Sequence, residues 1–251
     1  AKGQMKYYLA FASTCCPEGI GYAMSDHADG PWEWKGHIMN HTPQTRGNHP
    51  GIIDFKGKSY CFGLNYDVFR LETDRHAERR SCAAAEMTYN DDGTIQELPY
   101  FLHCKLNQVG SFNPYRRVEA ETMAWGFGLR TTRQNPSGPW NPTLFVTDID
   151  DGEHILVKGV DFANGASRFT ASCSALLYGG TIEIRIDSIE GKLIGKVDVP
   201  NTEFKYRELT TPLELVTGKH DLYFVFKGGK QQKKNLFNFD WWQMTPLKKG
   251  D

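Results

Sequence analysis

Short runs of alternating apolar and polar residues fill most of this 251-residue chain, and the periodicity of amphipathic helices is nearly absent. The alternation is clearest in TIEIRID (181–187) and DLYFVF (221–226). Because successive side chains of a β-strand point to opposite faces, this pattern is typical of strands with one buried face. Clusters of Gly, Pro, Asn and Asp separate the runs and mark turns. The sequence therefore predicts an all-β protein.

The first series of expected strands contains a set of three and a set of four. They are KYYLAFAS (6–13), GIGYAMSD (19–26), WEWKGHIM (32–39), then HPGIIDF (49–55), KSYCFGLN (58–65), SCAAAEMTY (81–89) and TIQELPY (94–100). Four consecutive strands are the content of one propeller blade, and the set of three lacks an innermost strand. Two incomplete repeats cannot cover their own sheet edges. We therefore expect residues 1–112 to be part of a β-propeller, either as a fragment or completed by another polypeptide.

A polar connection at 103–117 precedes a second series of nine short strands. They are RRVEAET (116–122), LFVTDID (144–150), HILVKGVDF (154–162), RFTASCSAL (168–176), TIEIRIDS (181–188), LIGKVDVP (193–200), RELTTPLEL (207–215), HDLYFVFKG (220–228) and LFNFDWWQM (236–244). Closely spaced short strands with regular turns are typical of antiparallel sandwiches. We expect a jelly-roll β-sandwich over residues 113–251.

Charge and cysteine content exclude several classes of function. The formal net charge is -1, from 29 basic and 30 acidic side chains spread along the chain, so no nucleic-acid or membrane-surface partner is indicated and a neutral partner is expected. The six cysteines include no CxxC pair, which argues against a zinc site. Cys15 and Cys16 are neighbours and are not expected to pair. Cys61 and Cys82 either face each other on consecutive strands or are free thiols.

The stretch RGNHPGI (46–52) brings Arg46, Asn48 and His49 together just before an expected strand. Pro50 and Gly51 restrict the backbone there. Hydrogen-bonding side chains grouped on a fixed turn indicate a site. The alternative without function is a surface arginine beside a satisfied core histidine.

Several motifs resemble known families. Residues 116–244 contain, in order, RRVEAETMAWG, IDDGEHILVKGVDF, GGTIEIRIDSIEGKLIGKV, GKHDLYFVFKG and NFDWWQM, which resemble carbohydrate-binding module family 6. The preceding strands, from KYYLAFAS to RGNHPGIIDFKGKSYCFGLNY, resemble the last blades of a glycoside hydrolase family 43 propeller. The resemblance implies part of a five-bladed β-propeller followed by a β-sandwich jelly-roll module. It also implies an enzyme that degrades arabinoxylan.

By this resemblance, hydrolysis proceeds with inversion and needs a general base, a general acid and a third carboxylate that tunes the acid. The family places the acid just before the strand that reads MKYYLAF here, and the other two in earlier blades. We therefore expect no catalytic residue in this chain, an N-terminal propeller segment in the same or a separate chain, and an inactive chain on its own. Four other carboxylates are expected to be solvated surface charges: Glu18, Glu72, Glu78 and Glu86.

The resemblance also assigns supporting roles to the RGNH residues. It implies that His49 holds a water-bound cation or a polar network in the propeller channel, a task that suits neutral imidazole. Arg46 and Asn48 are expected to hydrogen-bond sugar hydroxyls or a catalytic carboxylate from the other blades.

In the sandwich, Glu119 and Glu121 alternate on one strand and point the same way, and the family brings Asp240 of the last strand close to them. Three converging carboxylates repel one another without a cation, and calcium prefers such oxygen ligands. The resemblance implies a structural calcium there, completed by carbonyls of a loop such as PSGPWN (136–141).

The sugar site implied by the family lies in loops at one end of the sandwich, where two rings enclose a sugar and Asn238 bonds its hydroxyls. At the usual ring positions this chain has Asp148 in TDIDDGEH and TEFKYREL (202–209), which leaves Tyr206 as the ring, with Phe204 behind it. Weak binding, binding through another surface with Trp125 or Trp140, or a purely supporting role are the alternatives.

Two functions remain open from the sequence. One is the C-terminal portion of a glycosidase that acts on arabinoxylan or xylo-oligosaccharides, as an α-L-arabinofuranosidase or a β-xylosidase. The other is a noncatalytic carbohydrate-binding or scaffold protein with a degenerate propeller. Substrate and family imply secretion or a periplasmic location in a bacterium.

Overall fold

The structure is a computed structural model, and it describes all residues except 1–5, 46, 66–80, 105, 134–142 and 248–251. The described chain consists of β-strands with one 3-10 turn, and none of its helices is long and apolar enough to cross a membrane. It divides into two compact units, Ala1–Val109 and Gly110–Asp251. The second unit begins before the boundary expected after residue 112, because Phe112 exchanges backbone hydrogen bonds with Gly159 and Asp161 of the sandwich.

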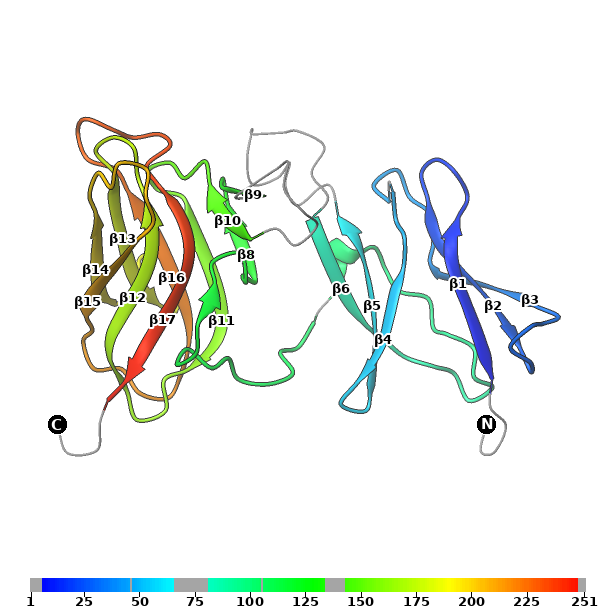
Figure 1. Cartoon of the computed structure of the whole chain (residues 1–251). Helices are drawn as coiled ribbons and strands as arrows, with labels where there is room; N and C mark the ends of the chain where they lie inside the picture. Colours follow the sequence, from blue (N-terminus) through cyan, green and yellow to red (C-terminus); the bar gives the residue numbers. More distant parts are fainter. Residues whose placement is uncertain (1–5, 46, 66–80, 105, 134–142, 248–251) are drawn as a thin grey trace. The chain divides into compact units, whose positions relative to one another are not determined.

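Two antiparallel three-stranded sheets form the first unit (Figure 1). One contains β1 (Tyr7–Ser13), β2 (Gly19–Ser25) and β3 (Glu33–Met39), and the other contains β4 (Gly51–Phe55), β5 (Lys58–Asn65) and β6 (Ser81–Met87). Their strands lie where the apolar alternation predicts them. Buried side chains from both sheets and from the segment after β6 form one core: Ile20, Tyr22, Met24, Ile38, Met39, Cys61, Ala85, Met87, Ile95, Tyr100 and Phe101.

The segment 94–100 is not the fourth strand that the sequence predicts. Its Ile95 forms an isolated bridge with Tyr89, and its Leu98 forms a parallel bridge with Met39 of β3. Apolar residues recur three apart here, at Ile95, Leu98 and Phe101, which does not fit the two-residue period of a strand. The segment therefore crosses to the first sheet and leads into the 3-10 turn η1 (Phe101–His103), which buries Phe101.

Strand β4 is apolar but uncovered. All five of its residues are exposed, including Ile53 at 53% and Phe55 at 50%, and Phe62 on the neighbouring β5 is 41% exposed. Side chains on both faces of β4 are accessible, since Ile52 and Ile53 point in opposite directions. A strand of this composition normally packs against another layer.

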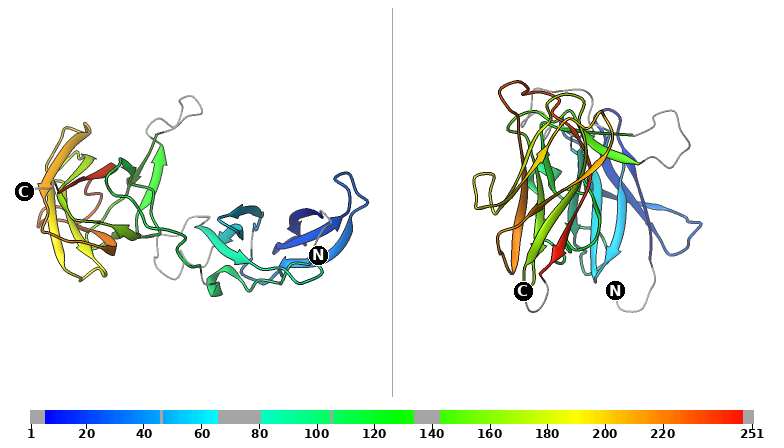
Figure 2. Two further views of the ribbon diagram at one scale, coloured as in Figure 1. Left: turned by 90° about the horizontal axis from the view of Figure 1, so that it is seen from below. Right: turned by 60° about the vertical axis from the view of Figure 1, so that its left-hand side comes forward.

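Two facing antiparallel sheets form the second unit (Figures 1 and 2). The first has the order β15-β12-β17-β10-β9, with β7 paired to β17, and the second has the order β14-β13-β16-β11-β8. Their bounds are β7 (Val118–Glu119), β8 (Trp125–Phe127), β9 (Arg130–Arg133), β10 (Leu144–Thr147), β11 (His154–Asp161), β12 (Ala166–Ser174), β13 (Gly180–Ile186), β14 (Leu193–Val199), β15 (Arg207–Pro212), β16 (Lys219–Lys227) and β17 (Asn238–Pro246).

The expected sandwich is thus present, with eleven described strands rather than nine. Strands β8 and β9 were missed because they are too short to show an alternation. The core between the sheets is rich in rings: Phe169, Phe224 and Trp242 are fully buried, and the Phe224 and Trp242 ring centroids lie 5.2 Å apart at an interplanar angle of 69°. Such edge-to-face pairs add to the hydrophobic stabilisation of a core.

Candidate functional site

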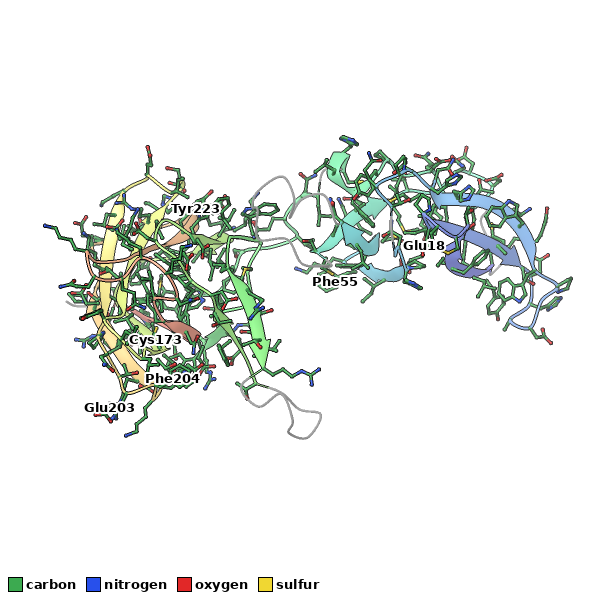
Figure 3. The ribbon with its side chains drawn as sticks, turned by 90° about the horizontal axis from the view of Figure 1, so that it is seen from above. Glu18, Phe55, Cys173, Glu203, Phe204 and Tyr223 are labelled. Carbon is green, nitrogen blue, oxygen red and sulfur yellow. A yellow bond between two sulfur atoms is a disulfide. The ribbon has the colours of Figure 1, made fainter. Side chains whose placement is uncertain are left out.

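One candidate site lies in the first unit, where the β1–β2 loop meets the segment between β3 and β4. The carboxylate of Glu18 accepts a hydrogen bond from the backbone N–H of Gly47 at 2.7 Å, which ties the two segments together. Between them lies a pocket of about 710 Å3, which Glu18 and Gly47 help to line. The expectation that Glu18 is a solvated surface charge is therefore wrong, since Glu18 (labelled in Figure 3) is partly buried and its carboxylate is bonded to the backbone of Gly47.

Cys15 and Cys16 form a disulfide, so the expectation that these neighbours do not pair is also wrong. Cys16 lines the pocket. Cys61 and Cys82 are free thiols, because the strand register places Cys61 opposite Ala85 and Cys82 opposite Leu64. Cys61 is buried, and burial raises its thiol pKa to about 12. Cys82 is exposed.

Asn48 is fully buried, which does not fit the role expected for it, a hydrogen bond to a sugar hydroxyl or to a catalytic carboxylate from other blades. Its side-chain oxygen accepts a hydrogen bond from the backbone N–H of Leu64 at 2.9 Å. Strand β4 begins at Gly51, opposite Phe62, so the N–H of Leu64 lies beyond the end of its neighbour strand. The Asn48 amide satisfies this donor in place of a backbone carbonyl. Arg46 lies outside the described residues.

His49 is exposed, so it is not a satisfied core histidine. Its position next to the buried Asn48 fixes its backbone, and its ring makes no hydrogen bond within the described part of the chain. Of the other carboxylates weighed from the sequence, Glu86 forms an exposed ion pair with Lys58 at 2.7 Å, as expected of a surface charge. Glu72 and Glu78 lie outside the described residues.

A second candidate site is the group of carboxylates on β7 and β17. A β-bulge leaves Asp240 unpaired, because Ser172 of β12 pairs with Trp241 and Cys173 pairs with Phe239. Bulges re-aim side chains, and this one turns Asp240 away from the core while Trp242 stays buried. Glu121 is partly buried, and its Oε2 atom is buried without a hydrogen-bond partner.

The electrostatics of this group show mutual repulsion. Burial raises the pKa of the Glu121 carboxyl, and the nearby Glu119 and Asp240 raise it further. Burial likewise raises the pKa of Asp240, and Glu119 adds to the effect. Glu119 itself is paired with Arg117 through a bidentate contact of 3.0 and 3.2 Å.

These carboxylates do not form a tight cage. The oxygens of Glu119, Glu121 and Asp240 do not all lie within 4.8 Å of one another. The loop PSGPWN, expected to add carbonyl ligands, lies outside the described residues. The donor set nevertheless fits a hard cation, because it offers an unpartnered buried carboxylate oxygen and two neighbouring acids.

The third candidate site is the end of the sandwich where β17 begins. Asn238 accepts a hydrogen bond from the Thr147 hydroxyl at 2.8 Å, and its amide donates to the Ser174 hydroxyl at 3.3 Å. These bonds fix the orientation of the amide, and each of its polar atoms retains capacity for one more hydrogen bond. Asn238 is only partly buried, so a ligand at this end of the unit can reach it.

The role expected for Tyr206, as the ring that stacks on a sugar at this end, stays a prediction. Tyr206 has a buried hydroxyl, its ring packs edge-on against Phe145, and burial raises its pKa above the ordinary range. Phe204, expected behind it, is 61% exposed at the margin of the unit (Figure 3). Its backbone has a φ of 61°, and the preceding Glu203 has a φ of 55°, so the two residues form a left-handed turn that is unfavourable for bulky side chains. Asp148 forms an ion pair with Arg130 at 3.1 Å instead of supplying a ring.

Trp125, the alternative sugar-binding residue, lies on the outer face of the five-stranded sheet. It pairs with Leu156 of β11, which pairs in turn with Tyr223 of β16. All three side chains are partly buried, so this row offers a partly accessible apolar surface. Trp140 lies outside the described residues.

Comparisons with known proteins identify the family of the module and the relatives of the whole chain. Residues 119–246 match the sequence profile of "Carbohydrate binding module (family 6)". The chain is 36% identical to an arabinoxylan arabinofuranohydrolase of Paenibacillus polymyxa, covering 98% of this chain and 40% of that protein. It is 37% identical to an arabinoxylan arabinofuranohydrolase of Bacillus subtilis, covering 91% of this chain and 45% of that protein.

A solved structure is similar along nearly the whole chain. It is a glycoside hydrolase family 43 arabinoxylan arabinofuranohydrolase from Bacillus subtilis in complex with cellotetraose, with 34% identity and a TM-score of 0.78. The match covers 98% of this chain and 53% of that one. The chain therefore spans about half the length, or less, of the relatives that it matches.

Proposed function

Since the chain belongs to carbohydrate-binding module family 6 and joins that module to part of a glycoside hydrolase family 43 propeller, we propose that it serves arabinoxylan hydrolysis. The proposed reaction is removal of α-L-arabinofuranosyl groups with inversion. Identity of 36–37% to two arabinoxylan arabinofuranohydrolases over more than nine-tenths of the chain carries this proposal. The same observation favours arabinofuranosidase over β-xylosidase activity.

The catalytic acid and base are proposed to come from further propeller blades. Three described acids of the first unit already have structural partners: Glu18 with Gly47, Glu86 with Lys58, and Asp26 with Lys6. The exposed apolar strand β4 supports a covering layer, because burying the exposed half of Ile53 and of Phe55 would gain about 1 kcal/mol each. In that assembly the exposed His49 would face the other blades, where it is proposed to hold a channel cation or a polar network.

The test is an activity and binding assay on the pure 251-residue chain. It should bind arabinoxylan in an affinity gel but release no arabinose from the polymer and no nitrophenol from the arabinofuranoside or xyloside. Addition of a propeller segment that restores a closed ring should restore arabinose release. Cleavage by the chain alone would refute the proposal that the catalytic carboxylates come from further propeller blades. A closed ring without activity would favour the noncatalytic scaffold instead.

The module is proposed to bind the polysaccharide at the loop end. Asn238 would donate to and accept from sugar hydroxyls, and Phe204 would supply the apolar face against which a sugar ring stacks. Tyr206 would support Phe204 from behind, since its own hydroxyl is buried. Asn238→Ala should abolish binding to xylo-oligosaccharides in calorimetric titrations. Unchanged affinity would indicate that the oligosaccharide binds at the Trp125 surface instead.

A structural calcium is proposed for the module, held by Glu121 and Asp240 with Glu119. The cation would neutralise the acids whose pKa values are raised by burial and by one another. Calcium in hundredfold excess over its Kd should stabilise the module by about 2.7 kcal/mol, and excess EDTA should remove this effect. Glu121→Gln should retain the fold but weaken the calcium response. A melting temperature that is insensitive to EDTA would refute the proposal that calcium binds at this site.

An extracellular or periplasmic location is proposed from the substrate, which is too large to enter a cell. The Cys15–Cys16 disulfide supports it, because disulfides persist in oxidising compartments. Alkylation of protein recovered from culture medium, with and without reductant, would test this point.

A further inference from the structure

The pocket in the first unit combines apolar and polar walls. Cys16, Pro17 and Glu18 line it from the β1–β2 loop, and His41, Thr42 and Pro43 line it from the segment after β3. Its volume of about 710 Å3 is in the range of small-molecule sites. The disulfide and the two prolines offer no side-chain hydrogen-bond donor, whereas Glu18, His41 and Thr42 carry polar groups.

Oxidation of Cys15 and Cys16 determines what this wall can bind. Glu18 Oε1 lies 3.4 Å from Cys16 Sγ and 3.9 Å from Cys15 Sγ. These contacts are not hydrogen bonds, because disulfide sulfurs carry no hydrogen. The sulfurs are not thiolates either, so the three groups do not form a metal site. They form a polarisable apolar surface that favours close van der Waals contact.

Both walls are fixed before any ligand binds. The Glu18 carboxylate accepts a hydrogen bond from the Gly47 N–H at 2.7 Å, and both residues line the pocket. In the opposite wall, the fully buried Thr45 accepts a hydrogen bond from the Thr42 N–H at 2.9 Å and donates its own N–H to the Thr42 carbonyl at 3.0 Å. Walls that do not need to be ordered on binding preserve affinity.

We propose that this pocket binds one neutral sugar ring of the xylan main chain, with the C–H face of the ring against Pro43 and against Cys16 of the disulfide. Its hydroxyl edge would face Glu18, His41 and Thr42. A sugar presents just this pairing of an apolar face with a hydroxyl rim, and the Glu18 carboxylate disfavours anionic ligands. The inference rests on the proposed action on arabinoxylan and names where the main chain is held.

Site-resolved NMR titration of the full chain with xylotetraose tests this proposal. The amide signals of Thr42 and Gly47 should shift in the oxidised protein. The Cys15→Ser, Cys16→Ser double variant should weaken this titration by about five- to tenfold, an effect expected for loss of one stacking wall. Cys82→Ser, which replaces an exposed free thiol, is the matched control and should titrate like wild type.

Reversible reduction of the wild-type disulfide gives a second measurement in case the double variant does not fold. Reduction should weaken the Thr42 and Gly47 titration, and reoxidation should restore it. Shifts at Asn238 but none at Thr42 and Gly47 would refute sugar binding in the pocket and would still support carbohydrate binding by the module. Shifts that are indifferent to reduction would overturn the role of the disulfide. Absence of shifts at both sites would refute both sugar binding in the pocket and the proposed action on arabinoxylan.

Discussion

Replacement of Asn48 by alanine should destabilise the first unit without removing any direct sugar contact. The change leaves the Leu64 N–H without its 2.9 Å acceptor in a fully buried environment, which costs about 1–3 kcal/mol. Loss of the packed amide adds about 1 kcal/mol. A Cβ added at Gly63 would lie only 2.8 Å from the Asn48 oxygen, so the backbone of Gly63 packs closely against this side chain. The neighbouring backbone cannot easily move in to fill the space that the amide leaves. The total is about 2–4 kcal/mol.

For a unit of this size, about 4 °C of melting temperature corresponds to 1 kcal/mol, so the shift should be roughly 8–16 °C. Differential scanning calorimetry of the whole chain measures it, with the sandwich transition as an internal reference. His49→Ala is the matched control, because this adjacent side chain is exposed and should change stability by less than about 0.5 kcal/mol. An Asn48→Ala variant with wild-type stability and weakened sugar binding would refute the structural role.

Three further outcomes are expected. Phe204→Ala should weaken oligosaccharide binding by about tenfold in calorimetry, with an unchanged melting temperature because the ring is exposed; a large stability loss would contradict this. The pKa of Asp151 is lowered because its carboxylate accepts hydrogen bonds from a lysine and from a backbone N–H. The free energy that the ionised carboxylate adds to the folded state is therefore fully present above the ordinary pKa of 3.8 and is lost as pH falls through the lowered pKa. Asp151→Asn should therefore flatten the acid limb of the stability curve by less than about 1 kcal/mol, and an unaltered limb would count against the ion pair. Gly63→Ala should cost about 1–3 kcal/mol in denaturant titrations, because its Cβ would clash with the buried Phe101 ring. Gly51→Ala is the matched control, since its Cβ meets only ordinary contact at 3.7 Å, and equal effects of the two changes would refute the steric argument.

Alternation of apolar residues was sufficient to predict the all-β class and most strands of the sandwich, including β13 and β16. It works because a strand with one buried face imposes a two-residue period on its own sequence. The spaced motifs of residues 116–244 likewise identified the module family, which the match over 119–246 confirms. Short strands such as β8, and the three-residue spacing of 94–100, carry no such period and were misread.

The roles of individual site residues were decided by tertiary structure. Asn48 and His49 are neighbours in one polar motif, yet only the end of β4 determines that one is buried beneath Leu64 and the other exposed. The partner of Glu18 lies 29 residues away, and the exposed Phe204 has a left-handed backbone that its residue type disfavours. Local patterns thus determine which segments become strands, because that preference is repeated along each segment. Burial and hydrogen bonding of a single side chain depend on residues distant in sequence, and only the folded chain brings those together.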